Sequence, residues 1–406
     1  MMPTPDRSPL KLKFPAGTDN QSREFEIPDG AARRIINMDV TRAGAVRVRD
    51  GLRRLSSTPC HSLFPRASGA LLVSGGQLCR MAADYSLTPL VPVVGRVSYA
   101  DHNAEIFWSD GASVGRITTA GQASFWGLTA PAAQITTTAG AWPAGLYRIA
   151  LTARVYGVES GASAVTLPIA DGQAVTVTTP AAANEVDFIV YATARDGTEL
   201  RQVAILPPNA TGIPALRDWG KPLLSLHATA PPAGRYVRAY SGRLWIAAEK
   251  TLWFTASLSP HWIFPADHFV QFERPITLLD AVADGLYVST DQRVYFLQGA
   301  APAQMHQRVV SPFGAVPGTG NHQGPRETLA GDAAPDQMVY WVDQDGAVCV
   351  GRSGGIIERV TAARFRAPGA SLGHSAYREH QGIRQLIIAL AGASTAADDT
   401  PIRGQP

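Results

Sequence analysis

Cysteine and charged residues are both scarce in this sequence. It has three cysteines in 406 residues, and only 17% of its residues are Asp, Glu, Lys or Arg. Cys60, Cys79 and Cys349 are odd in number and none share Cys-x-x-Cys spacing, so we expect neither a disulfide framework nor a zinc site. This usage suits folding in a reducing compartment. Low charge also argues against long exposed helices, which need charged faces.

Long apolar runs are missing as well. No stretch of 18 apolar residues occurs, so we expect no membrane span. The first 13 residues lack the apolar core of a signal peptide, so none is expected. The formal net charge of +3 is too small to indicate a nucleic-acid-binding protein by itself.

Turn-forming residues, by contrast, are abundant. The 38 glycines and 30 prolines punctuate short β-branched or aromatic runs from one end of the chain to the other. Two such runs joined by two to four turn residues are typical of a β-hairpin. The pattern predicts an all-β protein, with hairpins over residues 35–49, 70–81, 242–255, 286–297 and 338–350.

The hairpins recur at a roughly regular spacing. Leu72 and Ile106 are 34 residues apart, Ile246 and Tyr287 are 41 apart, and Tyr287 and Tyr340 are 53 apart. A period of roughly 40–50 residues, with four strands in each unit, is typical of a β-propeller. The spacing therefore predicts a propeller of six or seven degenerate blades. A series of ordinary β-sandwiches is the alternative that it leaves open.

One gap of 140 residues, from Ile106 to Ile246, breaks this spacing. Inside it, residues 128–208 are rich in Ala and Thr and include alternating strand patterns at 145–152 and 186–191. Removing these 81 residues leaves a gap of 59, which is close to the repeat period. The segment resembles an immunoglobulin-like or fibronectin type III sandwich. We predict propeller parts at 1–127 and 209–392, the insert at 128–208 and a loose tail at 393–406.

Sequence motifs for catalysis and metal binding are weak. Gly-x-Ser-x-Gly occurs at 111–115 and 369–373, but both matches lie among hairpins, whereas a nucleophile elbow needs a following helix. Asp343-Gln344-Asp345-Gly346 resembles the start of a calcium loop, yet Gly354 stands where the distal glutamate is required. We expect hairpin turns here and predict no catalytic residue, metal site or cofactor. An enzyme with its site in a central channel stays open as an alternative.

A basic segment near the beginning of the chain is a candidate binding site. Alternation along a strand places Arg47 and Arg49 on one face. This face is either solvated or engaged in ion pairs between subunits, or it contacts phosphate or an acidic partner. No aromatic residues are interleaved, so base stacking is not supported. The candidate residues are Arg33, Arg34, Arg42, Arg47, Arg49, Arg53 and Arg54.

Two aromatic residues form a second candidate. Trp262 and Phe264 lie in a connection without periodicity between Pro260 and Pro265. Exposed aromatic side chains on such a loop would indicate an interface with another molecule.

Three segments outside the insert carry a family resemblance. They are residues 34–55 (Arg34-Ile35-Ile36-Asn37-Met38-Asp39-Val40-Thr41 and onward), 241–255 and 275–297. They resemble the tail nozzle proteins of short-tailed bacteriophages, also called tail hub or packaged-DNA stabilisation proteins. The resemblance implies a propeller subunit, present in six copies around the tail axis of the virion and assembled in the cytoplasm of the bacterial host.

The same resemblance implies partners and a function. The homohexameric ring would lie below the portal and adaptor proteins and retain the packaged double-stranded DNA without sequence specificity. It would conduct that DNA during ejection, and tail fibres or tip proteins would dock to it. The family has no catalytic residues, and the insert is a departure from its pattern. Two alternatives are a carbohydrate-binding or carbohydrate-active propeller with an accessory sandwich, and a tail or baseplate component of a long-tailed phage.

Overall fold

The computed structural model describes residues 13–36, 38–41, 44–48, 54–66, 69–132, 134–217, 219–324, 326–327, 333–334, 337–380 and 383–392. Over these ranges the protein is all-β, as predicted: strands alternate with turns, and the helical elements are three short 3-10 turns. None of the helices in these ranges is long and apolar enough to cross a membrane. The predicted tail at 393–406 lies outside the described residues.

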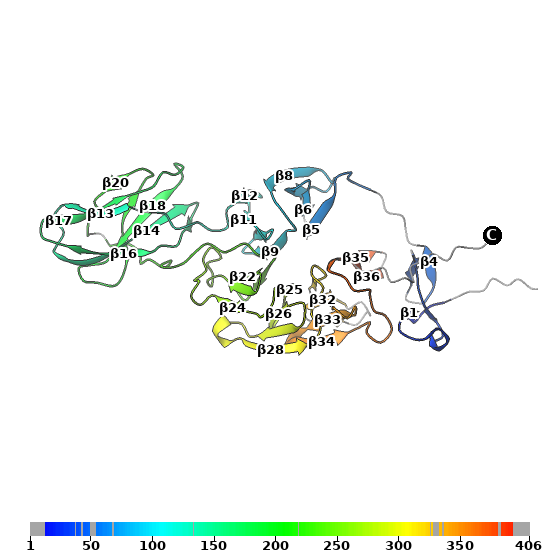
Figure 1. The fold of residues 1–406 in the computed structure, drawn as a ribbon. Coiled ribbons are helices and arrows are strands. Elements are labelled where there is room, and N and C mark those ends of the chain that lie inside the picture. Colours follow the sequence, from blue (N-terminus) through cyan, green and yellow to red (C-terminus); the bar gives the residue numbers. More distant parts are fainter. Residues whose placement is uncertain are drawn as a thin grey trace, which may run out of the picture. The chain divides into compact units, whose positions relative to one another are not determined.

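The chain forms two compact units (Figure 1). Unit 1 combines residues Met1–Ser57 with Ile276–Pro406, and unit 2 is Thr58–Pro275. Unit 1 is therefore built from the two ends of the chain.

Unit 2 contains three four-stranded antiparallel sheets, each with its strands adjacent in chain order. The first consists of β5 (Cys60–Arg66), β6 (Gly69–Ser74), β7 (Gln77–Met81) and β8 (Leu87–Pro92). The second consists of β9 (Ser98–His102), β10 (Glu105–Ser109), β11 (Val114–Ile117) and β12 (Ala123–Ser124). The third consists of β21 (Tyr236–Tyr240), β22 (Arg243–Ala248), β23 (Thr251–Phe254) and β24 (Phe269–Gln271).

Unit 1 contains two further sheets of four antiparallel strands. One consists of β25 (Leu278–Val282), β26 (Gly285–Ser289), β27 (Val294–Gln298) and β28 (His306–Ser311). The other consists of β29 (Asn321–Gln323), β32 (Met338–Val342), β33 (Val348–Arg352) and β34 (Ile356–Arg359). The described residues of this unit also form four two-stranded sheets: β1 (Gly17–Thr18) with β2 (Ala31–Ala32), β3 (Met38–Val40) with β4 (Val46–Val48), β30 (Arg326–Glu327) with β31 (Ala333–Ala334), and β35 (Leu372–His380) with β36 (Ile383–Ala391).

The turn residues explain why these runs fold back on themselves. Ser74 pairs with Gln77 across a two-residue loop, Gly75-Gly76. Both glycines have positive φ, 57° and 74°. This conformation matches the twist of a tight hairpin and is nearly free of strain only for glycine.

Apolar side chains are buried between successive four-stranded sheets. Strands β6 and β7 share one hydrophobic cluster with strands β9 to β11. Strands β9 and β10 share another with β21 and β22, and in unit 1 strands β25 to β27 share a third with β32 and β33. Neighbouring sheets in these pairs thus stack face to face, because neither could bury its apolar face alone.

A recurrent serine fastens one sheet to the chain segment that leads into the next. Ser109 ends β10, and its Oγ accepts the backbone N–H of Gly234, just before β21, at 2.9 Å. Ser289 ends β26, and its Oγ accepts the N–H of Ala315, before β29, at 2.8 Å. A serine at the end of the second strand therefore makes this contact in one sheet before the insert and in one sheet after it. The repeat resumes where the insert ends.

The predicted insert forms a separate pair of sheets between β12 and β21. One sheet has the order β13 (Gln134–Ala139), β17 (Gln173–Thr178), β20 (Thr211–Gly212). The other contains β15 (Val158–Glu159), β14 (Gly145–Val155), β18 (Asp187–Ala192) and β19 (Arg201–Leu206), with β16 (Ala164–Ile169) pairing β14. Both sheets contribute to one core, which includes Trp142, Tyr147, Val175 and Phe188. Since β20 pairs with β17, this sheet extends beyond the expected boundary at Pro208.

Candidate functional site

The first Gly-x-Ser-x-Gly motif is a hairpin turn. Ser113 lies between β10 and β11, and its backbone N–H donates to Asp110 Oδ1 at 2.6 Å. Asp110 also accepts the N–H of Ala112 at 2.9 Å and, through Oδ2, that of Val94 at 2.8 Å. Burial raises the pKa of Asp110, but these backbone hydrogen bonds outweigh it and leave the pKa below its usual value. Strand-to-strand geometry is the opposite of the strand-to-helix turn that a nucleophile elbow requires.

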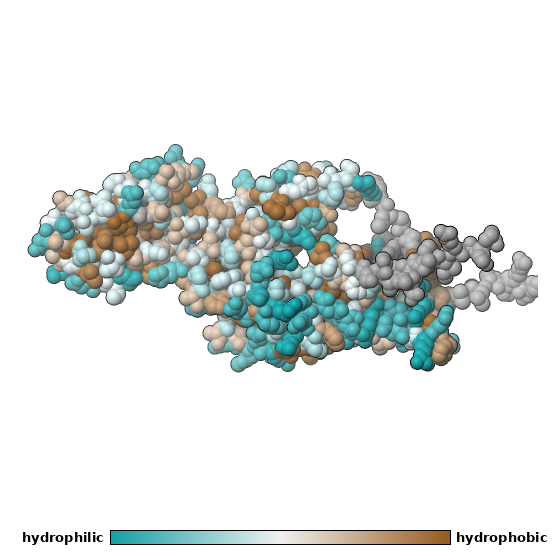
Figure 2. Space-filling model, in the orientation of Figure 1, coloured by the Kyte–Doolittle hydropathy of each residue, from teal (hydrophilic) through white to brown (hydrophobic). Residues whose placement is uncertain are grey.

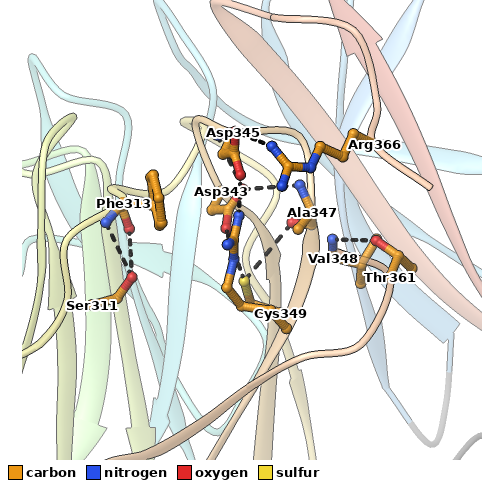
Figure 3. A network of polar contacts seen from close by, with 10 residues as sticks. Ser311, Phe313, Asp343, Asp345, Ala347, Val348, Cys349, Thr361 and Arg366 are labelled. Carbon is orange, nitrogen blue, oxygen red and sulfur yellow. Dashed lines mark hydrogen bonds and ion pairs between the residues drawn. The ribbon is translucent and has the colours of Figure 1, made fainter. Parts of the chain in front are cut away.

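The acidic turn at 343–346 joins β32 to β33, as the sequence predicts (Figure 3). Asp343 is almost fully buried. Its Oδ1 accepts the backbone N–H groups of Asp345 at 3.1 Å and Ala347 at 2.9 Å. Its Oδ2 accepts Nε of Arg359 at 2.8 Å. The positive charge paired with the Asp343 carboxylate is therefore that of an arginine side chain.

Asp345 extends this pair into a network of four charged side chains. It forms ion pairs with Nη2 of Arg359 through Oδ2 and with Nη1 of Arg366 through Oδ1, the latter at 2.7 Å. The guanidinium of Arg359 also lies over the ring of Phe313, 4.3 Å from its centroid. Burial alone would lower the pKa of the Arg359 guanidinium, but its hydrogen bonds to Asp345 and Asp343 have the larger combined effect. The pKa of Arg359 is therefore raised above its usual value. We call these four residues, Asp343, Asp345, Arg359 and Arg366, the clamp, because their ion pairs hold the turn between β32 and β33 to Arg359 and to the segment that follows it.

Cys349 lies beside this clamp and is buried. Its Sγ is 3.4 Å from Asp343 Oδ2. Burial first, and then the neighbouring carboxylate, raise the pKa of the thiol well above its usual value. A thiol held protonated in this way is a poor nucleophile and a packing element of β33.

The described arginines of the basic segment bind largely within the chain. Arg33 donates through Nη1 to the carbonyl of Ser22. Arg54 donates to the carbonyls of Ser56 at 2.8 Å and Ser57 at 2.7 Å. Arg34 is exposed. The predicted candidates Arg42, Arg49 and Arg53 lie outside the described residues.

Arg47 lies on a hairpin with inverted polarity. On strands β3 and β4 it pairs in register with Asp39. Asp39 is buried and forms an ion pair with Arg378 of β35 at 3.4 Å. On the opposite face, Met38 and Val48 stand directly across from each other and are 44% and 69% exposed. The charged face of this hairpin is turned inward and the apolar face outward.

Trp262 and Phe264, the candidate interface aromatics, are half-buried. The indole N–H of Trp262 donates to the carbonyl of Glu159 in the insert. Phe264 packs edge-on against His268, with ring centroids 5.0 Å apart. These partners tie the connection to its own unit, and contact with another molecule stays a prediction. Sequence spacing gave no sign of the Glu159 contact, because the two residues are 103 positions apart.

The comparisons with known proteins give little further information. No family model and no curated protein matches the chain. Among solved structures it is similar to a proposed 6-phosphogluconolactonase from Bacteroides fragilis, at 10% identity over 59% of this chain and 77% of that one, with a TM-score of 0.24. It is also similar to Hsv2 of Kluyveromyces lactis, at 13% identity over 50% of this chain and 62% of that one, with a TM-score of 0.17.

A third solved structure is PorZ, a surface component of the type-IX secretion system of Porphyromonas gingivalis. It shows 11% identity over 82% of this chain and 44% of that one, with a TM-score of 0.22. Similarities of this size carry no argument about function.

Proposed function

We propose that this protein is a structural subunit of a bacteriophage tail, and specifically of the nozzle or hub ring below the portal and adaptor. In this proposal the four-stranded sheets are the blades of a β-propeller and the insert is an immunoglobulin-like docking module. The assembled ring retains packaged DNA and conducts it at ejection.

The observation that carries the proposal is the repeat itself. Five four-stranded antiparallel sheets follow one another, and the serine contact before β21 recurs before β29. A chain built from stacked, similar units presents an extended surface for binding neighbours. The acidic turn at 343–346 is held in a clamp of paired arginines and aspartates, which favours a mechanical role over a chemical one.

The inverted hairpin supports assembly into a ring. An apolar face on β3 and β4, with Met38 and Val48 exposed and Asp39 buried, costs free energy in an isolated monomer. A second copy of the chain is the partner that a closed, symmetric oligomer would place there. The exposed Arg33 and Arg34 of the same segment are suited to an ion pair with a neighbour or to DNA phosphate.

Localisation in the intact particle tests the proposal. Cryo-electron microscopy of virions from the phage that encodes this chain, with an epitope tag at the exposed loop around Asp171, should place the tag at the tail in six copies. A tag on the capsid, or absence of the chain from purified virions, would overturn it. A long contractile or flexible tail bearing the tag would favour the long-tailed alternative.

A carbohydrate-active propeller is the alternative from another class. It requires a pair of carboxyl groups set to act on one glycosidic bond. The acidic turn offers two neighbouring carboxyl groups, those of Asp343 and Asp345, but Arg359 forms an ion pair with each of them. Release of reducing sugar from bacterial polysaccharides by the purified chain, abolished by a single carboxylate substitution, would establish this alternative.

A further inference from the structure

A cavity opens on the insert beside its apolar core, with which it shares Trp142, Tyr147 and Ala174. Its volume is about 590 Å³, within the roughly 300–1,000 Å³ that is usual for small-molecule sites. Figure 2 shows apolar side chains gathered on the visible face of the insert. The cavity is lined by Gly140, Ala141, Trp142, Pro143, Tyr147, Ala174, Ala194, Arg195, Ile213, Pro214, Ala215, Leu216, Arg217 and Trp219. Half of these residues are Gly, Ala or Pro, which leave backbone groups within reach of a ligand.

The inner wall of the cavity is rigid. The indole N–H of Trp142 donates to the carbonyl of Pro214 at 3.2 Å. The hydroxyl of Tyr147 donates to the carbonyl of Pro143 at 2.9 Å. Both aromatic rings are buried and contact each other, with centroids 5.1 Å apart. Because their polar atoms are already satisfied, these rings form an apolar floor.

The outer wall is the extended segment that follows β20. Its exposure alternates: Pro214 is buried and Leu216 packs against the core, whereas Ile213 and Trp219 are 53% and 37% exposed. This alternation places Ile213, Arg217 and Trp219 on the outward side of one strand-like segment. A tryptophan ring that is exposed at a cavity mouth offers a flat apolar surface for stacking.

Arg195 is held at the mouth by its turn. The backbone N–H of Leu146 donates to Asp196 Oδ1 at 2.8 Å, and the N–H of Asp196 donates to the carbonyl of Leu146 at 2.9 Å. The stem of Arg195 packs over Gly145, where an added Cβ would lie 2.7 Å from its Cγ. Its guanidinium is 3.4 Å from Asp196, in a pair whose members are both more than half exposed. Such a pair is weak in water, so an incoming anion can compete for the guanidinium.

We propose that this cavity binds a saccharide that carries a carboxylate. One sugar ring stacks its apolar face on Trp219, its hydroxyls meet the backbone groups of the small lining residues, and its carboxylate accepts hydrogen bonds from Arg195. Among the described residues of the lining, the charged ones are Arg195 and Arg217, both cations. This selects an acidic sugar over a neutral one.

The proposal deepens the docking role given to the insert, but it rests on the cavity alone. Binding of an acidic saccharide could be present in a protein that is no part of a virion. Conversely, the chain could be a tail subunit whose insert binds only protein. The two proposals therefore fail independently.

Isothermal titration of the full chain with trigalacturonate tests the proposal, with 3′-sialyllactose as a second acidic probe. The fully methyl-esterified trigalacturonate is the matched neutral probe, because it keeps the same rings without the charge. We expect saturable binding of an acidic probe and at least tenfold weaker binding of the ester. Sodium acetate alone should not bind measurably, since it lacks the ring that stacks on Trp219.

Variants assign the binding to this cavity. W219A should weaken binding of the acidic probe about tenfold or more. R195Q should remove most of the preference for acid over ester while retaining the stacking. R154Q is the control, because Arg154 forms a partly exposed arginine–aspartate pair with Asp187 elsewhere on the insert, at 2.9 Å. I205A controls for loss of an exposed apolar side chain on β19.

Three results would overturn the proposal. They are no binding of either acidic probe below 1 mM, equal binding of acid and ester, and unchanged binding by W219A. Circular dichroism and the melting temperature of each variant establish that the variant is folded. A variant that fails this check is replaced by W219F or R195K, for which smaller losses in the same order are expected.

Discussion

Asn20 and Arg366 are joined by two hydrogen bonds that run in opposite directions. The side-chain Nδ2 of Asn20 donates to the carbonyl of Arg366 at 2.8 Å, and the backbone N–H of Arg366 donates to Asn20 Oδ1 at 3.0 Å. The backbone N–H of Asn20 also donates to the carbonyl of Arg364 at 2.8 Å. The two bonds to Arg366 span 346 residues of sequence. They explain why the first segment of the chain belongs to the same compact unit as the last.

Asn20→Ala should therefore loosen the attachment of the first segment. The substitution removes the two hydrogen bonds to Arg366, each worth about 1 kcal/mol, and an exposed one that Gln21 Nε2 donates, so we expect about 1–2 kcal/mol of destabilisation. Hydrogen–deuterium exchange should show faster exchange in peptides covering 13–36 and 360–368. Asn184→Ala, at an exposed position of the insert, is the control and should leave exchange in these peptides unchanged. Equal exchange in N20A and the native chain would contradict this role.

Local hairpins could be predicted from the sequence, whereas contacts between distant segments could not. The glycines at 75 and 76 and the acidic turn at 343–346 mark their turns because a tight turn needs particular residue types. The attachment of Asn20 to Arg366 has no such sign, since any polar side chain at the right place could form it. The same applies to Trp262, whose partner Glu159 is fixed only by the fold.

The candidate site was predictable only in part, for the same reason. The basic composition of residues 33–54 is plain in the sequence, but the inward position of Asp39 depends on Arg378 of a strand more than 300 residues later. The cavity on the insert was missed altogether. The signal available in the sequence was the alternation of Ile213, Ala215, Arg217 and Trp219, which is typical of a strand face, although the described residues of this stretch form no named strand.

Arg359 should be the most sensitive member of the clamp. Arg359→Met removes the cation from buried Asp343, and leaving a buried carboxylate without its partner costs about 3 kcal/mol. Asp343→Asn in the same chain should restore part of this loss, since asparagine keeps an oxygen for the N–H groups of Asp345 and Ala347. Urea unfolding measures the destabilisation by R359M and its partial recovery by D343N, and hydrogen exchange of residues 338–360 measures the same two changes locally. If R359M unfolds at the same urea concentration as the native chain, the clamp contributes nothing.

The three thiols should differ sharply in reactivity. Cys60 is exposed, whereas Cys79 and Cys349 are buried and burial raises the pKa of each thiol. A raised pKa lowers the thiolate fraction, and burial blocks access as well. At pH 8, Ellman's reagent should modify one thiol per folded chain rapidly and the other two only after denaturation. Cys60→Ser should abolish the rapid phase, and a rapid phase that persists in this variant would refute the assignment.

His261 should make stability depend on pH. Its Nδ1 donates to the carbonyl of Trp126, and burial is the main cause that lowers its pKa. The folded pKa lies below the unfolded value of about 6.5. The unfolded state therefore binds the proton first, and stability that is fully present above pH 6.5 is lost as the pH falls below it.

His261→Asn removes the imidazole that binds this proton and keeps a hydrogen-bond donor near the position of Nδ1. Differential scanning calorimetry between pH 8 and pH 5 should give a smaller fall in melting temperature for H261N than for the native chain. His61, His102 and His268 shift in the same direction, so part of the fall should remain. His227→Asn, at an exposed turn, is the control. Parallel pH profiles for H261N and the native chain would rule out this contribution.

The apolar face of the β3–β4 hairpin should hold subunits together. Met38→Asp with Val48→Asp places two charges on this face, and burying an unpaired charge at an interface costs several kcal/mol. Since both side chains are exposed within one chain, the substitutions should leave the fold intact. Light scattering coupled to size-exclusion chromatography should then report a smaller particle than for the native chain. Ile356→Asp, at an exposed position of β34, is the control and should leave the particle mass unchanged. A monomeric native chain would remove the basis for a ring, and an unchanged oligomer in the double variant would move the interface to another face.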